Sequence, residues 1–267
     1  MTELADAEQA AAALYEHRGG VALITLNRPR NLNAVNSALS TAVGAHLEHA
    51  EGDSNVQVVV ITGNGRAFCA GADLKALSAG EDTGADGHSE WGFAGYTQHW
   101  ITKPTIAAVN GFALGGGTEI VLASDLAVVD EKAALGLPEV KRGLFAAAGG
   151  VIRLQQQIPR KVALELALTG RPLSAHEGKE LGLVNRVAAS GTALDVALEL
   201  AGQIAANAPL SIRESKAMIH RTASSSDWGL DAWNWNAEAI TRVFGSEDAK
   251  EGPLAFAEKR EPRWVGR

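Results

Sequence analysis

The sequence predicts an α/β protein with a layered core followed by a helical C-terminal region. Strand-like and helix-like patterns alternate through the first half of the chain, whereas from about residue 149 onward the pattern is mostly helical. Alternation of this kind is typical of helices packed on the faces of a sheet. The short strand, turn and helix segments also suit a spiral of stacked strand–strand–helix turns, so the pattern leaves both arrangements open.

Four short apolar runs predict the strands of the core. The run at 56–62 is almost continuous Val and Ile, which indicates a strand buried on both faces. Helical spacing is clearest where Leu39, Val43 and Leu47 form one stripe. We expect strands at 21–26, 56–62, 105–109 and 126–129, and helices at 37–50, 73–76 and 118–123. Residues 1–14 are expected to form a loose helix or a frayed tail.

The second half predicts a series of helices. Ser174 and Glu177 form a capping box, in which each side chain satisfies a backbone N–H at the start of a helix. Apolar residues then form a stripe over 194–205, and Pro209 is expected to end that helix. Further helices are expected at 162–168, 210–221 and 229–244.

Composition limits the function classes. The chain has 267 residues, of which 46% are hydrophobic, enough for one sizeable core or one domain with an appendage. The net charge of −7 disfavours nucleic acid or an acidic membrane as a partner. No apolar run approaches the roughly 20 residues of a membrane span, and the N-terminus lacks the pattern of a signal peptide. The single cysteine, Cys69, excludes an internal disulfide, so we expect a cytoplasmic enzyme.

The most informative stretch is 115–119, Gly-Gly-Gly-Thr-Glu, where bare backbone leads directly into an apolar helix. Removing or adding a proton beside a thioester carbonyl puts negative charge on its oxygen, which backbone N–H groups at a helix start can stabilise. Gly116 and Ala72 are candidate donors, while Glu119 and Glu139 are candidate acid–base groups. Each has a simpler interpretation: a tight turn for the glycines, and favourable first-turn or helix-starting positions for the glutamates.

The sequence gives little support for a metal site, a serine nucleophile or a dinucleotide-binding site. The seven histidines show no metal spacing, no serine lies in a G-x-S-x-G turn, and Gly63-Asn64-Gly65 lacks the third glycine of a dinucleotide-binding site. Cys69 has small neighbours and no evident base, which favours a core thiol. Arg28, Arg30 and Lys75 lie near turns and could meet phosphates, although isolated cations are more often solvated surface charges.

Read together and in order, the motifs resemble the enoyl-CoA hydratase/isomerase (crotonase) superfamily from about Gly20 to Arg267. The matching segments are 26–29 with 32–34, 68–74, 103–111, 114–119, 124–126, 137–139, 149–150, 168–170 and 182–185. Each segment is weak alone, but their order is highly specific.

The resemblance implies an α/β fold with a ββα spiral catalytic core, assigned to 1–200, and a helical trimerisation region, assigned to 201–267. It implies an acyl-CoA thioester substrate, a homotrimer or a dimer of trimers, no metal, and no cofactor other than the coenzyme A of the substrate. Ala72 and Gly116 would form the oxyanion hole; Glu119 would activate water for the β-carbon, and Glu139 would handle the α-carbon proton. The residues expected at coenzyme A are Arg28, Arg30, Ala70, Asp73, Leu74, Lys75, Phe256 and Lys259, the last pair reaching a neighbouring subunit's coenzyme.

Two glutamates favour an enoyl-CoA hydratase or the reverse dehydratase, and segments 92–95 and 246–260 look closest to carnitinyl-CoA dehydratases. The alternatives are a Δ3-Δ2-enoyl-CoA isomerase or an acyl-CoA hydrolase using one glutamate, or a non-catalytic acyl-CoA-binding protein. Ala146 stands where many hydratases carry proline. The glycine-rich, acidic segment 78–90 is expected to be a mobile loop, and 78–100 varies among relatives and lines their acyl pocket. The sequence therefore does not determine the identity of the acyl group.

Overall fold

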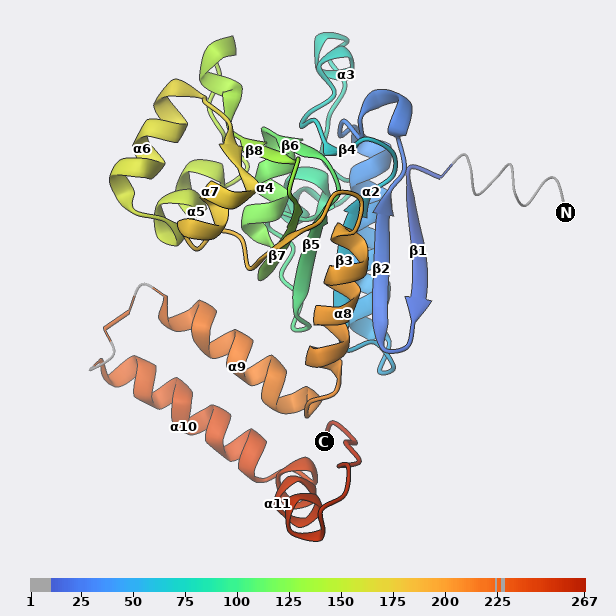
Figure 1. Ribbon diagram of the computed structural model, residues 1–267, viewed down its shortest axis with the longest axis vertical. Helices are drawn as coiled ribbons and strands as arrows, with labels where there is room; N and C mark the ends of the chain where they lie inside the picture. The colour runs from blue at the N-terminus through green and yellow to red at the C-terminus, as the bar shows by residue number, and fades with distance from the viewer. Residues whose placement is uncertain (1–10, 224, 227–228) are drawn as a thin grey trace, which may run out of the picture.

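The computed structural model describes residues 11–223, 225–226 and 229–267, and it contains an α/β core with a helical region at its C-terminal end (Figure 1). A six-stranded sheet forms the centre of the core, in the order β1-β2-β3-β5-β7-β10. Only β1 is antiparallel to its neighbour. The strands are β1 (Ala13–Arg18), β2 (Val21–Leu26), β3 (Val58–Gly63), β5 (Thr105–Val109), β7 (Leu126–Asp130) and β10 (Arg186–Ala188).

Both faces of this sheet are covered by helices. Ile24 and Ile61 face the hydrophobic cluster beneath α2 (Ser37–Gly52), whereas Leu23 and Val60 face a second cluster beneath α8 (Ala193–Ala205). A strand buried on both faces needs apolar residues at every position, which explains the unbroken Val/Ile run of β3. Each fully buried Val, Leu or Ile side chain stabilises the fold by roughly 1.5–3 kcal/mol.

A second, four-stranded sheet lies beside the first, in the order β4-β6-β8-β9. Its strands are β4 (Ala67–Cys69), β6 (Phe112–Leu114), β8 (Ala134–Gly136) and β9 (Leu173–Ser174). Because β4, β6 and β8 directly follow β3, β5 and β7, each turn of the chain adds one strand to each sheet. The chain therefore forms a spiral of strand–strand–helix turns, one of the two arrangements that the sequence left open.

Helices complete these turns and form the C-terminal region. They are α3 (Leu74–Ser78), α4 (Gly116–Ala123), α5 (Gly150–Gln157), α6 (Arg160–Thr169), α7 (Ala175–Glu180), α9 (Pro209–Thr222), α10 (Leu230–Phe244) and α11 (Asp248–Glu258). Short 3-10 turns are η1 (Pro29–Asn31), η2 (Ser89–Trp91), η3 (Phe93–Gly95) and η4 (Pro138–Arg142). The capping-box prediction is confirmed in part, since the Glu177 N–H donates to Ser174 Oγ at 3.2 Å.

Two predictions about the chain's course differ from the structure. Residues 13–18 form β1 rather than a loose helix or tail, because Gly19 and Gly20 both adopt positive φ and close a tight hairpin onto β2; the first ten residues lie outside the described part of the chain. Pro209 does not end the 194–205 helix. It opens α9 as the first helical residue, where its missing N–H costs nothing.

The helical region attaches to the core through charged contacts. On α9, Lys216 Nζ lies 2.8 Å from Asp125 Oδ2, and His220 Nε2 lies 2.7 Å from Asp125 Oδ1. Helix α8 packs on the sheet and includes residue 200, and the division of the chain into 1–200 and 201–267 stays a prediction. Across the described residues, no helix combines the length and apolar character needed to cross a membrane.

Candidate active site

The glycine turn at 115–117 is held against both neighbouring strands. Gly115 has a φ of +55°, and its N–H donates to Gly136 O at 2.8 Å. A Cβ on Gly117 would lie 2.2 Å from Cys69 O, so only glycine fits there. Helix α4 starts at Gly116, and the first N–H groups of a helix lack a partner within it. The turn thus does more than reverse the chain, because it presents the Gly116 N–H group at the start of a helix.

The second candidate donor loop lies directly beside this turn. Gly71 has a φ of +94°, and a Cβ there would lie 2.9 Å from Leu114 O and 3.3 Å from Gly116 N. The backbone leading into Ala72 therefore runs along the backbone leading into Gly116. The structure brings together the two loops that the sequence proposed as an oxyanion hole.

Arg28 and Asp73 hold the Ala72 loop in place. Asp73 caps α3 by accepting from the Lys75 and Ala76 N–H groups. Arg28 Nη2 donates to Asp73 Oδ2 at 3.0 Å, and Arg28 Nη1 donates to Ala34 O. Burial opposes ionisation of Asp73, but the Arg28 and N-terminal donors outweigh it and lower its pKa. Both residues thus have a structural role, and their predicted contact with coenzyme A stays a prediction.

The other residues expected at coenzyme A fall into two groups. Arg30, Ala70, Leu74 and Lys75 lie around the same loop, with Arg30, Leu74 and Lys75 exposed. Phe256 and Lys259 lie on or just after α11, at the opposite end of the molecule from α3 (Figure 1). Phe256 is 87% exposed, and its helix lies well away from α4, which carries Glu119 (Figure 1). All of these binding roles stay predictions.

Glu119 points into the protein from the first turn of α4. Its side chain is buried, and its Oε1 accepts from the Gly150 N–H at 2.8 Å. Burial raises its pKa to about 7, and the negative charge of Glu139 adds to this effect, while the Gly150 N–H opposes it. The carboxyl can therefore gain or lose a proton near neutral pH, as an acid–base group must.

Glu139 reaches the glycine turn from the other side. It lies in η4 directly after Pro138, and a Cβ on Gly115 would lie 3.0 Å from its Oε1. Its Oε2 is buried and has no hydrogen-bond partner among the described residues. Burial raises its pKa above the ordinary range. A buried carboxyl oxygen without a partner is costly, and a substrate or water beside Gly115 would satisfy it.

Phe93 completes this site and was not singled out from the sequence. A Cβ on Gly116 would lie 2.2 Å from Phe93 Cε1, so the ring rests on the Gly116 α-carbon. Ala94 holds the turn beneath it in the left-handed region, with a φ of +61°. The sequence pointed to 78–100 as an acyl-pocket segment and to 92–95 as a family-like motif, but it assigned no role to Phe93.

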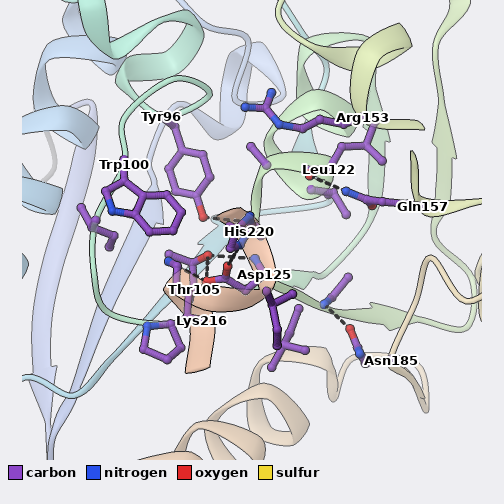
Figure 2. Close-up of a pocket in the computed structure, with 18 of the residues that line it drawn as sticks. Tyr96, Trp100, Thr105, Leu122, Asp125, Arg153, Gln157, Asn185, Lys216 and His220 are labelled. Atoms are coloured by element: carbon purple, nitrogen blue, oxygen red, sulfur yellow. Dashed lines mark hydrogen bonds and ion pairs between the residues drawn. The ribbon is translucent and has the colours of Figure 1, made fainter. Parts of the chain in front are cut away.

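A separate cavity of about 890 Å³ lies between α9 and the core, and neither glutamate lines it. Figure 2 shows Tyr96, Trp100, Asp125, Lys216 and His220 around it. Lys216 also lies over the Trp100 ring, 4.8 Å from its centroid. The cavity therefore marks the junction of the helical region with the core rather than the site at Glu119. Within the described ranges, no group of three or more His, Cys, Asp or Glu side chains is placed to hold a metal ion.

Comparison with known proteins identifies the family of this chain. The family model described as "Enoyl-CoA hydratase/isomerase" matches residues 16–267. The chain belongs to this family. It is 42% identical to a carnitinyl-CoA dehydratase of Proteus mirabilis, over 94% of this chain and 97% of that protein. These matches confirm the family predicted from the ordered motifs.

Solved structures confirm the fold of the family. An enoyl-CoA hydratase from Mycobacterium tuberculosis H37Rv is 46% identical, with a TM-score of 0.91, covering 96% of this chain and 100% of that one. A carnitinyl-CoA hydratase from Mycobacterium avium is 56% identical, with a TM-score of 0.77, covering 96% of this chain and 99% of that one. The predicted crotonase-like core with C-terminal helices is therefore correct.

Proposed function

We propose that this protein is a hydro-lyase that adds water reversibly across the 2,3-double bond of a 2-enoyl-CoA thioester, or removes it in the reverse direction. The observation that carries the proposal is the meeting of two carboxyls, the buried Glu119 and the half-buried Glu139, at one backbone cradle. The relatives named enoyl-CoA hydratase and carnitinyl-CoA dehydratase support it.

The cradle would bind the thioester oxygen. Charge builds on that oxygen as the double bond is attacked, and the Ala72 and Gly116 N–H groups would stabilise it. Removing one such donor typically costs about 3–4 kcal/mol of barrier. The N-terminus of α4 adds its positive dipole end at the same place.

The two carboxyls would divide the proton transfers. In hydration, ionised Glu119 accepts a proton from the water whose oxygen bonds to the β-carbon, and protonated Glu139 donates a proton to the α-carbon. Dehydration reverses both transfers. Interacting carboxyls in one site separate in pKa, which lets one act as acid while the other acts as base.

The test is loss of the conjugated-thioester absorbance when purified protein meets a panel of 2-enoyl-CoA substrates, including crotonyl-CoA and crotonobetainyl-CoA. Glu119→Gln and Glu139→Gln should each abolish most turnover while calorimetry still shows binding of the thioester. Turnover unaffected by Glu119→Gln would indicate the one-glutamate isomerase or hydrolase instead. Binding without turnover of any substrate would indicate a non-catalytic acyl-CoA-binding protein.

We also propose that the active form is a homotrimer or a dimer of trimers, with coenzyme A as part of the thioester substrate and no separate cofactor or metal. Support comes from the exposed apolar side chains of the helical region: Leu230 and Phe244 on α10 are 80% and 75% exposed, and Phe256 is 87% exposed. Phe256 could then stack on the adenine, and Lys259 pair with a phosphate, of a neighbouring subunit's substrate. Light scattering of Phe256→Ala and the unchanged protein, with their KM values, tests this arrangement.

A further inference from the structure

The glycine pair Gly149-Gly150 lies between two charged side chains. A Cβ on Gly150 would lie 2.9 Å from Glu119 Oε1, and a Cβ on Gly149 would lie 2.1 Å from Arg153 Nη1. Gly149 also has a φ of +103°, which side chains rarely adopt. The positive φ of Gly149 and a Cβ position at Gly150 only 2.6 Å from the Ala146 Cβ explain the glycines, and the turn lies with a carboxylate on one side and a guanidinium on the other.

Arg153 binds this turn with its own side chain. It lies in the first turn of α5, where its N–H donates to Gly149 O at 2.9 Å. Its Nη1 donates to Ala148 O at 3.4 Å, and its Nη2 donates to Thr97 O at 2.5 Å. Figure 2 shows the side chain reaching back along the edge of the cavity toward the segment that carries Tyr96. One guanidinium thus joins the turn that serves Glu119 to the segment that follows Phe93.

The charge of Arg153 also acts on Glu119. Burial raises the pKa of Glu119, while Arg153 and the 148–150 backbone oppose that rise. The other charged or titratable groups that face this pair are Glu139, which raises the Glu119 pKa, and Tyr96, whose own pKa burial raises to about 12. Burial lowers the Arg153 pKa, and Glu119 and Tyr96 oppose that change. Arg153 is therefore the positive charge in this group.

We propose that Arg153 is a positioning residue for the reaction, holding the Gly149-Gly150 turn so that the Gly150 N–H orients the Glu119 carboxylate and keeps it ready to accept a proton. The inference rests on the proposed hydratase function. Through Thr97, the same side chain also fixes the segment that places Phe93 on Gly116. It thereby links the proton-transfer group to the oxyanion cradle without touching the substrate.

Three variants separate this role from a general structural one. Arg153→Met removes both the charge and the hydrogen bonds while keeping an unbranched stem, Arg153→Lys keeps the charge, and exposed Arg160→Met is the matched control. We measure kcat, KM and the pH profile of kcat/KM in the hydration direction, normalised to active sites by the stoichiometry of thioester binding.

We expect Arg153→Met to lower kcat about 10- to 100-fold with little change in KM, because the carboxylate is misplaced rather than the substrate. The acidic limb of kcat/KM should move to higher pH by about one unit, since Glu119 loses a nearby positive charge. Arg153→Lys should restore that limb but not the whole of kcat, because one ammonium cannot reproduce the planar donor geometry. Arg160→Met should match the unchanged protein.

The inference is overturned if Arg153→Met retains kcat, or loses kcat with an unmoved acidic limb. If that variant does not fold, Arg153→Lys decides: full activity overturns the inference, and a lower kcat with an unmoved limb and KM supports it. If the unchanged protein hydrates no substrate, the proposed function fails. The pKa of Glu119, followed by NMR of labelled carboxyls with and without Arg153→Lys and Arg153→Met, then tests the electrostatic link alone.

Discussion

Glu119 gives this protein an unusual dependence of stability on pH. A carboxyl whose pKa is raised on folding is neutral in both states below its ordinary pKa of 4.5, so it costs nothing there. Above its folded pKa of about 7 it is ionised in both states, and the folded state bears the whole cost of the buried charge. The contribution of Glu119 to unfolding free energy therefore becomes less favourable as pH rises from about 4.5 through 7.

The size of the effect follows from the two pKa values. A change from 4.5 to about 7 corresponds to about 3 kcal/mol, at 1.36 kcal/mol for each pH unit. Glu119→Gln removes the titration while keeping an oxygen that can accept from the Gly150 N–H. We expect the variant to gain stability relative to the unchanged protein as pH rises, reaching about 3 kcal/mol by pH 8.

Urea unfolding at one protein concentration and four pH values between 4.5 and 8 measures this difference. Fixed concentration matters because subunit association adds to apparent stability. Exposed Glu81→Gln is the matched control for the substitution itself. A stability difference for Glu119→Gln that is flat with pH, or that shrinks as pH rises, would refute the reasoning.

Three further predictions concern the supporting structure. Gly150→Ala should lower the free energy of unfolding by about 1–3 kcal/mol and reduce kcat, because the added Cβ would lie 2.6 Å from the Ala146 Cβ and close to Glu119. Gly202→Ala, in open space on α8, should instead raise the free energy of unfolding by up to about 1 kcal/mol. Thermal unfolding of the two variants measures both effects. Cys69 should resist iodoacetamide at pH 8 until the chain is unfolded, since its thiol is buried and burial raises its pKa to about 12. Mass spectrometry of native and urea-treated protein measures the alkylation. Rapid alkylation of the native protein would contradict the prediction. Asp125→Asn should lower the free energy of unfolding by about 1–3 kcal/mol and speed amide hydrogen exchange in α9, because Lys216 loses its carboxylate partner. Unchanged exchange in α9 would show that this ion pair does not anchor the helix.

Much of the core could be predicted because its signals are local. The strands β2 and β5 have the predicted bounds, since a strand buried on both faces leaves an unbroken apolar run in the sequence. The candidate acid–base pair was found for a similar reason: Glu119 lies two residues after a run of three glycines, and Glu139 directly follows a proline. These features depend on neighbours along the chain, which a single sequence records.

The features that were missed depend on contacts between distant segments. Phe93 matters because it rests on Gly116, and Arg153 matters because it reaches Thr97, 56 residues earlier in the chain. Strand β1 was missed because its pairing with β2 is decided by the positive φ of two glycines rather than by its own composition. The two glycines at 149–150 were visible as a motif, but only the structure shows which side chains press on them.

The second sheet determines more than the path of the chain. Ala72 follows β4 and Gly116 follows β6, and these strands are parallel neighbours in that sheet. The two N–H groups therefore lie just beyond neighbouring strands, whose regular spacing is about 4.8 Å, and the positive φ of Gly71 and Gly115 turns the backbone into position at the end of each strand. Evolution could then exchange the 78–95 segment, and with it the choice of acyl group, while the distance between the two donors stayed constant. A family built on this spacing could diversify its substrates without rebuilding its chemistry.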